Sequence, residues 1–174
     1  MSWRTIPAAL LNRPLPAAVT VSAVIALSSY AVAHFPRSIL VFLLFQASIR
    51  ENVRYINKKK PPLLAGTFGL HAPLTLSDST IDECRAAAPE GTGFHIHVSE
   101  SEDDGQTMFD GRKSGGGGWP VDWLNAHGIL GPRTIIAHGV HLDEYEMDQL
   151  ADTQTWVTHQ PRSNMNNAVG VADV

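Results

Sequence analysis

The stretch RTIIAHGVHLDEYEMDQLADTQTWVTH, at residues 133–159, decides the fold class of this 174-residue chain. Its apolar and amphipathic segments predict a strand, a helix and a second strand, at residues 133–140, 142–151 and 154–159. Asp143 and Glu146 have the spacing of a capping box and mark the start of the helix. Because strand, helix and strand in succession form a right-handed unit with parallel strands, the stretch predicts an α/β fold.

The same alternation extends towards the N-terminus. Further helices are expected at residues 48–60 and 77–88, and further strands at residues 63–70 and 93–98. Together the four strands would form a parallel sheet that is buried on both faces. The span 105–119 is rich in glycine, which opposes a helix by about 1 kcal/mol per residue, and we expect it to be irregular.

Each predicted strand carries, at its carboxyl end, a polar side chain that could bind a ligand or take part in catalysis. The carboxyl ends of the four strands carry, in turn, His71, His97 with Glu100, His138 and His159. The carboxyl ends of parallel strands meet at one edge, and in α/β barrels that edge carries the active site. Open sheets bind nucleotides at the same edge, but their glycine-rich phosphate turn is absent from this sequence. The run Gly115–Gly118 has no strand directly before it and no Lys-Ser after it, and we interpret it as a flexible loop.

Composition and charge narrow the function. The net charge is −4, and every acidic residue lies after residue 50, where acidic residues outnumber basic ones. An acidic domain argues against a nucleic-acid binder, which needs a basic face. The single cysteine, Cys84, excludes an internal disulfide and a cysteine-rich zinc cluster. We therefore expect a reduced, cytoplasmic protein in which any metal is bound by histidine and carboxylate.

Residues 1–47 differ from the rest and are predicted to be a separate apolar segment, ahead of a domain at residues 48–174. They contain no acidic residue and two uncharged runs, at residues 17–33 and 38–45. A membrane helix needs about 20 apolar residues, and neither run reaches that length. Two interpretations stay open: a membrane segment and, the one we favour, a segment foreign to the rest that arose from a gene-boundary or reading-frame error.

The sequence FHIHVSE, at residues 94–100, contains a candidate metal site. His95 and His97 are two apart on one strand, so both side chains point to the same face, and Glu100 follows at the strand end. Neutral imidazole binds zinc or iron, and a carboxylate beside the metal transfers protons between water and substrate. The alternative is a half-buried strand with two hydrogen-bonded histidines and a surface carboxylate.

His71 and His138 favour the metal site, because two further strands bring an imidazole to the same edge. The other histidines after residue 71 are assigned structural positions. We place His141 in a loop, His127 on an exposed helix surface and His159 at a strand end.

Asn164 lies in the sequence PRSNMNNAVG, at residues 161–170, which is expected to be a loop. Asparagine shapes loop backbone, and its amide also binds ligands, so two roles are open. The structural role is the simpler one, and Asn164 is kept as a candidate for substrate binding.

Four motifs, in this order and spacing, resemble the metal-dependent amidohydrolase superfamily: FGLHAPLTLSD, FHIHVSE, RTIIAHGVHLDEYEMDQLA and THQPRSNMNNAVG. The nearest branch contains guanine, cytosine and methylthioadenosine or adenosylhomocysteine deaminases and the chlorohydrolases. Within that branch, the chain is most similar to aminohydrolases of the SsnA type. The resemblance covers residues 48–174, about seven-tenths of the chain. It implies a TIM-type (β/α)8 barrel, of which this chain supplies about strands 4 to 7, and one divalent metal ion at the barrel mouth.

The resemblance also implies roles for single residues. His97 corresponds to a metal ligand, Glu100 to the proton shuttle, and His138 to the imidazole that orients the metal-activated water. His71 corresponds to a histidine that contacts a small-molecule substrate. The implied reaction is hydrolysis of a C–N bond other than a peptide bond, in which water attacks an amidine-like ring carbon and ammonia leaves. Zinc is favoured as the metal, although imidazole also binds iron and manganese.

The chain departs from the family pattern in its length and its ligands. A complete barrel takes about 250 residues. Only His34 precedes His71, so a first-strand His-x-His pair is lacking, and the chain ends at Val174 ahead of an eighth-strand aspartate. The ligand set is therefore expected to be incomplete, and the chain to be an enzyme fragment that is inactive alone. Its exposed sheet edges are expected to favour association with another chain, or aggregation.

Two other functions stay open beside the aminohydrolase fragment. The first is a membrane-tethered binding or interaction protein whose α/β part does not catalyse. The second, a small open-sheet nucleotide binder, is disfavoured by the lack of a phosphate loop.

Overall fold

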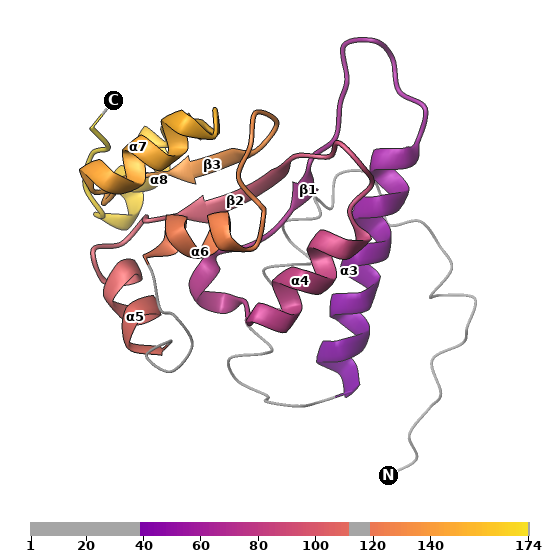
Figure 1. Ribbon diagram of the computed structural model, residues 1–174, viewed down its shortest axis with the longest axis horizontal. Coiled ribbons are helices and arrows are strands. Elements are labelled where there is room, and N and C mark those ends of the chain that lie inside the picture. Colours follow the sequence, from indigo (N-terminus) through magenta and orange to yellow (C-terminus); the bar gives the residue numbers. More distant parts are fainter. Residues whose placement is uncertain (1–38, 112–118, 174) are drawn as a thin grey trace.

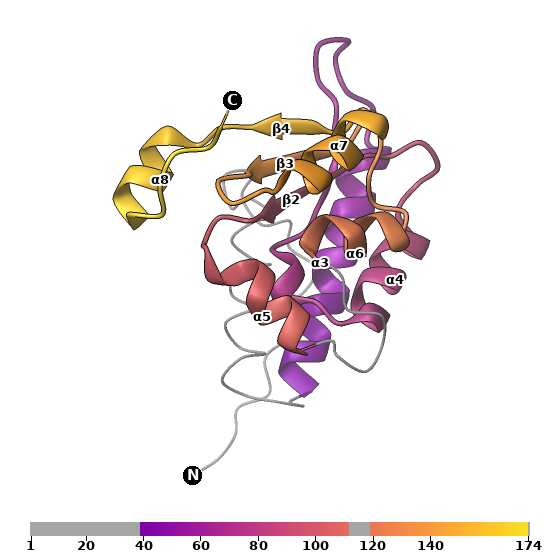
Figure 2. The same cartoon turned by 60° about the vertical axis from the view of Figure 1, so that its left-hand side comes forward.

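The computed structural model describes residues 39–111 and 119–173. Within these residues, four parallel strands form one sheet in the order β1-β2-β3-β4 (Figures 1 and 2). The strands are β1 (Phe68–Gly69), β2 (Phe94–Val98), β3 (Ile135–His138) and β4 (Trp156–Thr158). The fold class is therefore α/β with a parallel sheet. Strands that are neighbours in the sheet are also consecutive in the chain, which is the order found along the wall of an α/β barrel.

Helices connect and flank the strands. They are α3 (Ile39–Asn57), the 3-10 helix η1 (Pro73–Thr75), α4 (Asp78–Ala87), α5 (Asp103–Gly111), α6 (Pro120–Ala126), α7 (Glu144–Asp152) and α8 (Pro161–Asn167). In Figure 2 the arrowheads of β2, β3 and β4 point the same way, towards α8. Helix α8 therefore lies at the carboxyl end of the sheet.

One face of the sheet forms the hydrophobic core. Along β2 the exposure alternates: Phe94, Ile96 and Val98 are buried, whereas His95 and His97 between them are half-buried. The buried strand residues share one cluster with side chains of α3, α4, α6 and α7, among them Ile49, Ile81, Leu124 and Leu150. The two histidines of β2 consequently face away from this core.

The expected capping box is present at the start of α7. Glu146 N–H donates to Asp143 Oδ1 at 2.8 Å, and Asp143 N–H donates to Glu146 Oε2. The other carboxylate oxygen, Glu146 Oε1, accepts the N–H of Val121 in the first turn of α6. Burial raises the pKa of Glu146, which is 2% exposed. One buried carboxylate thus holds the beginnings of two helices.

Helix α3 begins earlier than predicted, at Ile39 instead of residue 48, and ends at Asn57 ahead of Pro61. It therefore includes most of the second apolar run, and Phe45 packs against the core. The first apolar run, at residues 17–33, lies outside the described residues. None of the described helices is both long and apolar enough to cross a bilayer. The proposed boundary at residue 47 stays a prediction.

The strand expected at residues 63–70 is reduced to Phe68–Gly69. Phe68 pairs with Phe94, the first residue of β2, so the preceding residues run past the end of their neighbour and have no strand to pair with. Leu63 is accordingly 97% exposed. The ladder continues beyond Gly69 through single bonds, since Leu70 N–H donates to the carbonyl oxygen of His95.

Two stretches that were expected to be irregular contain helices. Asp104 Oδ2 accepts the N–H groups of Glu100 and Ser101 ahead of α5, and these bonds organise the chain into a helix despite the glycines that follow. Residues 112–118 of that stretch lie outside the described residues. The loop expected at residues 161–170 is helical as far as Asn167, because Pro161 occupies the first turn, where its missing N–H is not needed.

Candidate metal centre

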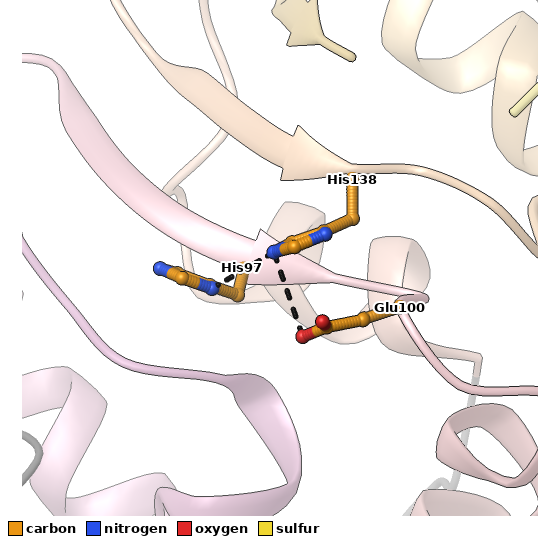
Figure 3. Close-up of side chains that lie close together, drawn as sticks. All are labelled: His97, Glu100 and His138. Carbon is orange, nitrogen blue, oxygen red and sulfur yellow. Dashed lines mark hydrogen bonds and ion pairs between the residues drawn. The ribbon is translucent and has the colours of Figure 1, made fainter. Parts of the chain in front are cut away.

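The carboxyl ends of β2 and β3 bring three side chains together (Figure 3). His97 Nδ1 lies 3.2 Å from His138 Nε2, which in turn lies 3.5 Å from Glu100 Oε2. One candidate ligand atom from each residue lies within 4.8 Å of the others. The strand register explains this meeting: Val98 pairs with His138, so the two strands end side by side.

The backbone turns sharply where these strands end. Ser99 (φ 49°) and His138 (φ 77°) adopt left-handed conformations, which non-glycine residues rarely take and which often mark functional sites. The N–H groups of Val140 and His141 both donate to the carbonyl oxygen of Ser99, at 2.9 and 3.1 Å. These bonds tie the loop after β3 to the loop after β2 and so hold Glu100 close to His138.

Helix α8 supports the cluster through two asparagines that lie one turn apart. Asn164 Oδ1 is 2.8 Å from His138 Nδ1, and both side chains are buried. Asn167 Nδ2 donates to Glu100 Oε1 at 2.9 Å. The structure thus places Asn164 against His138, and a substrate contact for its amide stays a prediction. Sequence reasoning missed Asn167. Its only sequence clue is that it lies three residues after Asn164, a spacing that puts both side chains on one face only if the segment is helical.

Two further histidines line the same face. The ring centroid of His71 is 6.0 Å from that of His97 in a stacked arrangement, and His71 Nδ1 is 3.2 Å from Thr75 Oγ1. The ring of His95 meets His97 edge-on, also at 6.0 Å. The structure therefore brings His71 beside the three-residue cluster without making it a member of that cluster.

Burial controls the protonation of these imidazoles. It lowers the pKa values of His71, His95 and His97. For His97, the neighbouring imidazoles, His138 first, lower the pKa further, while the Glu100 carboxylate opposes them. A lowered pKa keeps imidazole neutral at neutral pH, and the neutral ring is the form that binds metals.

The donor set fits a divalent transition metal. Two imidazole nitrogens and a carboxylate oxygen are ligands that zinc and related ions accept, and the half-buried His97 ring, whose pKa is lowered, needs no deprotonation before binding. His97 would supply a nitrogen donor, with His138 and Glu100 beside it, and Glu100 would act as an acceptor of protons.

The other described histidines make separate contacts. His127 is less exposed than expected: its side chain is 16% exposed, and its Nδ1 lies 2.7 Å from Asp82 Oδ1. His141 lies in a loop, as expected, where its Nε2 is 2.8 Å from the carbonyl oxygen of Val169. His159 follows β4, and its buried Nδ1 has no hydrogen-bond partner among the described residues.

A sequence model of the Amidohydrolase family matches residues 18–174, well over half of the chain. The chain belongs to the amidohydrolase family. The resemblance carried by the four motifs is thereby confirmed. The matched region of this amidohydrolase begins ahead of the motifs themselves.

Two curated relatives of this amidohydrolase are named deaminases. The 5'-deoxyadenosine deaminase of Methanothermobacter thermautotrophicus is 36% identical over 132 residues, which are 74% of this chain and 30% of that protein. The 5-methylthioadenosine/S-adenosylhomocysteine deaminase of Desulfitobacterium hafniense is 37% identical over 108 residues, 62% of this chain and 24% of that protein. This amidohydrolase therefore spans between about a quarter and three-tenths of the length of these relatives.

Solved structures share the fold of this amidohydrolase. An adenosine deaminase from Xanthomonas campestris with bound zinc superposes with a TM-score of 0.57 at 24% identity, over 76% of this chain and 28% of that one. The guanine deaminase of E. coli gives a TM-score of 0.62 at 21% identity, over 74% of this chain and 30% of that one. The parallel sheet and its helices thus match a part of each larger chain.

Proposed function

We propose that this amidohydrolase chain carries part of the active centre of a zinc-dependent aminohydrolase that removes the amino group from a purine-like heterocyclic amidine. The observation that carries the proposal is the convergence of His97, Glu100 and His138 at the carboxyl ends of neighbouring strands. The substrate class is supported by the relatives named as deaminases of 5'-deoxyadenosine and of 5-methylthioadenosine. Zinc is supported by the donor set and by the zinc in the Xanthomonas campestris enzyme.

In this proposal, β1 to β4 correspond to about strands 4 to 7 of a (β/α)8 barrel. Their consecutive order and the shared fold with larger chains support that placement. The ligands that complete the metal site would come from barrel strands outside this set. By itself the chain would bind metal weakly and would not turn over substrate.

Each residue has a role that its contacts allow. His97 would hold the metal, which when bound lowers the pKa of water towards about 7 and so supplies a nucleophile at neutral pH. His138, whose ring is held by the contact of its Nδ1 with Asn164, would help to orient the attacking water. Glu100 would carry a proton on Oε2 to a ring nitrogen of the substrate, since Oε1 accepts from Asn167. Water oxygen replaces the amino group at the amidine carbon, and ammonia leaves.

His71 would contact the substrate next to this cluster. Its Nδ1 is close to Thr75 Oγ1, so Nε2 is the nitrogen that stays available for a ligand. The stacked arrangement on His97 places the ring within reach of a molecule bound there.

Zinc binding tests the proposal directly. We expect the purified full chain to bind one zinc ion weakly in a chelator competition, and His97→Ala to weaken that binding by about tenfold or more, as loss of a ligand or its support does. His141→Ala is the matched control, because His141 is exposed and its side chain bonds only to the carbonyl of Val169 among the described residues. Ammonia release from 5'-deoxyadenosine or guanine is expected to stay at background.

The outcomes separate the parts of the proposal. Equal zinc affinity in the wild type and in His97→Ala would contradict the metal site. Ammonia release by the chain alone that disappears in His97→Ala would support the site and contradict the inactivity of the chain.

A further inference from the structure

We propose that Asn164 sets the direction of a two-histidine hydrogen-bond relay and thereby leaves Nε2 of His97 as the nitrogen that is free to bind a metal. The relay runs from His97 through His138 to Asn164. It deepens the proposed function and rests on it for the use of that nitrogen. Asn164 is in this view a positioning residue, because it acts through two imidazoles.

The relay begins at Asn164 Oδ1, an amide oxygen, which can only accept a hydrogen bond. Asn164 Oδ1 lies 2.8 Å from His138 Nδ1, so in the neutral ring the proton of His138 is on Nδ1. The lone pair of His138 is then on Nε2. Glu100 Oε2, at 3.5 Å, is at the limit of hydrogen-bond range, so the shorter contact with Asn164 decides where the proton is.

The second contact transmits this choice to His97. His97 Nδ1 lies 3.2 Å from His138 Nε2, and since Nε2 of His138 is an acceptor, His97 Nδ1 must be the donor. A neutral imidazole carries one proton, so Nε2 of His97 keeps its lone pair. An asparagine two contacts away therefore determines which nitrogen of His97 is basic.

The surroundings keep the relay in place. Asn164 is 1% exposed and His138 is 2% exposed, so water is excluded as a replacement partner. The backbone of Asn164 is also held, because its N–H donates to the carbonyl of Gln160 and its own carbonyl accepts from Val169. Leaving a buried polar group without a partner is unfavourable, which opposes breaking the contact between Asn164 and His138.

The opposite orientation of the amide gives the opposite result. If Asn164 Nδ2 faced His138 Nδ1, the protons would lie on Nε2 of both imidazoles, and Nε2 of His97 could not bind a metal. The two arrangements thus differ in a property that can be measured on the metal-free protein.

The test is the side-chain nitrogen NMR spectrum of the full chain labelled with ¹⁵N-histidine, without metal, at about pH 8, where histidine is ordinarily neutral. His97→Gln and His138→Gln assign the two rings. We expect both rings to carry the proton on Nδ1. Asn164→Asp keeps an acceptor and is expected to preserve this tautomer, whereas Asn164→Leu removes the acceptor and is expected to shift both rings towards protonation at Nε2. Met165→Leu, at an exposed position of the same helix, is the control and is expected to leave the spectrum unchanged.

A wild-type His138 ring protonated on Nε2 overturns the proposal, whatever the variants do. An unchanged spectrum in folded Asn164→Leu also overturns it. If circular dichroism shows that Asn164→Leu is unfolded, the wild-type and Asn164→Asp spectra test the proposal, which requires the proton on Nδ1 of both rings in both proteins. Protons on Nδ1 of both rings together with a failure to bind zinc would support the relay and contradict only the proposed function. A drop in zinc affinity of about tenfold in folded Asn164→Leu would show that the relay supports the metal binding of the proposed function.

Discussion

The amino end and the carboxyl end of the sheet differ in packing, in hydrogen bonding and in backbone strain. At the amino end, Gly93 leaves no space for a side chain, and the Thr134 hydroxyl both donates to the carbonyl of Ile129 and accepts the N–H of Phe94. At the carboxyl end, Ser99 and His138 keep side chains on left-handed backbone, where glycine would be easier. Tight packing and paired polar groups therefore mark one end, and strain marks the other.

Unpaired polar atoms follow the same division. The two buried side-chain atoms that lack a hydrogen-bond partner among the described residues, His159 Nδ1 and Asn164 Nδ2, both come after the carboxyl end of β4. Both atoms thus lie on the carboxyl side of the sheet, and Asn164 also contacts His138 of the candidate metal centre. The difference teaches that tight packing and paired polar groups stabilise the amino end, whereas strained backbone and unpaired polar atoms occur at the carboxyl end, where α/β barrels carry their active sites.

The largest effect is expected from Gly93→Ala. A Cβ atom on Gly93 would lie 1.7 Å from the carbonyl oxygen of Arg133, a contact that can be relieved only by separating β2 from β3. We expect a loss of more than about 4 kcal/mol in the free energy of unfolding, or no folded protein, measured by urea denaturation. Gly66→Ala is the control, because the nearest atoms belong to the exposed ring of Tyr55, which can move. Equal stability of the two variants would contradict the assignment of tight packing to the amino end.

A smaller loss is expected from Thr134→Val, which keeps the side-chain shape and removes the hydroxyl. The buried N–H of Phe94 and carbonyl of Ile129 both lose a partner. Since each unsatisfied group costs about 1–3 kcal/mol, we expect a loss of about 2–4 kcal/mol in urea unfolding. Thr92→Val, in the turn ahead of β2, is the control and is expected to change stability by about 0.5 kcal/mol or less. A loss no larger than that of the control would show that the Thr134 bonds contribute little.

The pH dependence of stability tests the buried carboxylate of Glu146. Because burial raises its pKa above the ordinary 4.5, the folded chain binds more protons than the unfolded chain between these two values. Its contribution to stability is therefore present below the ordinary pKa and is lost as pH rises through the folded pKa. We expect the unfolding free energy of the wild type, minus that of Glu146→Gln, to fall from about pH 4 to about pH 7 in urea titrations. A difference independent of pH would contradict the effect of burial.

The smallest effect is expected from Ser99→Gly at the carboxyl end. Glycine relieves about 1 kcal/mol of left-handed strain but also makes the unfolded chain more flexible by a similar amount. We expect a net change within about 0.5 kcal/mol, compared with the large loss from adding one methyl group at Gly93. Differential scanning calorimetry of both variants gives the comparison. A loss above about 1 kcal/mol would mean that the Ser99 side chain contributes packing at this end as well.

The sequence by itself predicted the parallel α/β class, four strands and the edge of the sheet at which the candidate metal centre lies. Periodicity and capping are local properties, so the capping box of α7 and the positions of His71, His97 and His138 at the carboxyl ends of their strands could be read directly. Strand lengths could not be read from the sequence, because the length of β1 depends on where its neighbour β2 begins.

Only the tertiary structure decided which groups support the centre. Asn164 contacts His138 across 26 residues of chain, and Asn167 contacts Glu100 across 67. Such pairs have no signature in local spacing, because their meeting depends on where the fold places α8 relative to the carboxyl ends of β2 and β3. The same reason hid the contact between His127 and Asp82, which joins two helices 45 residues apart in the chain.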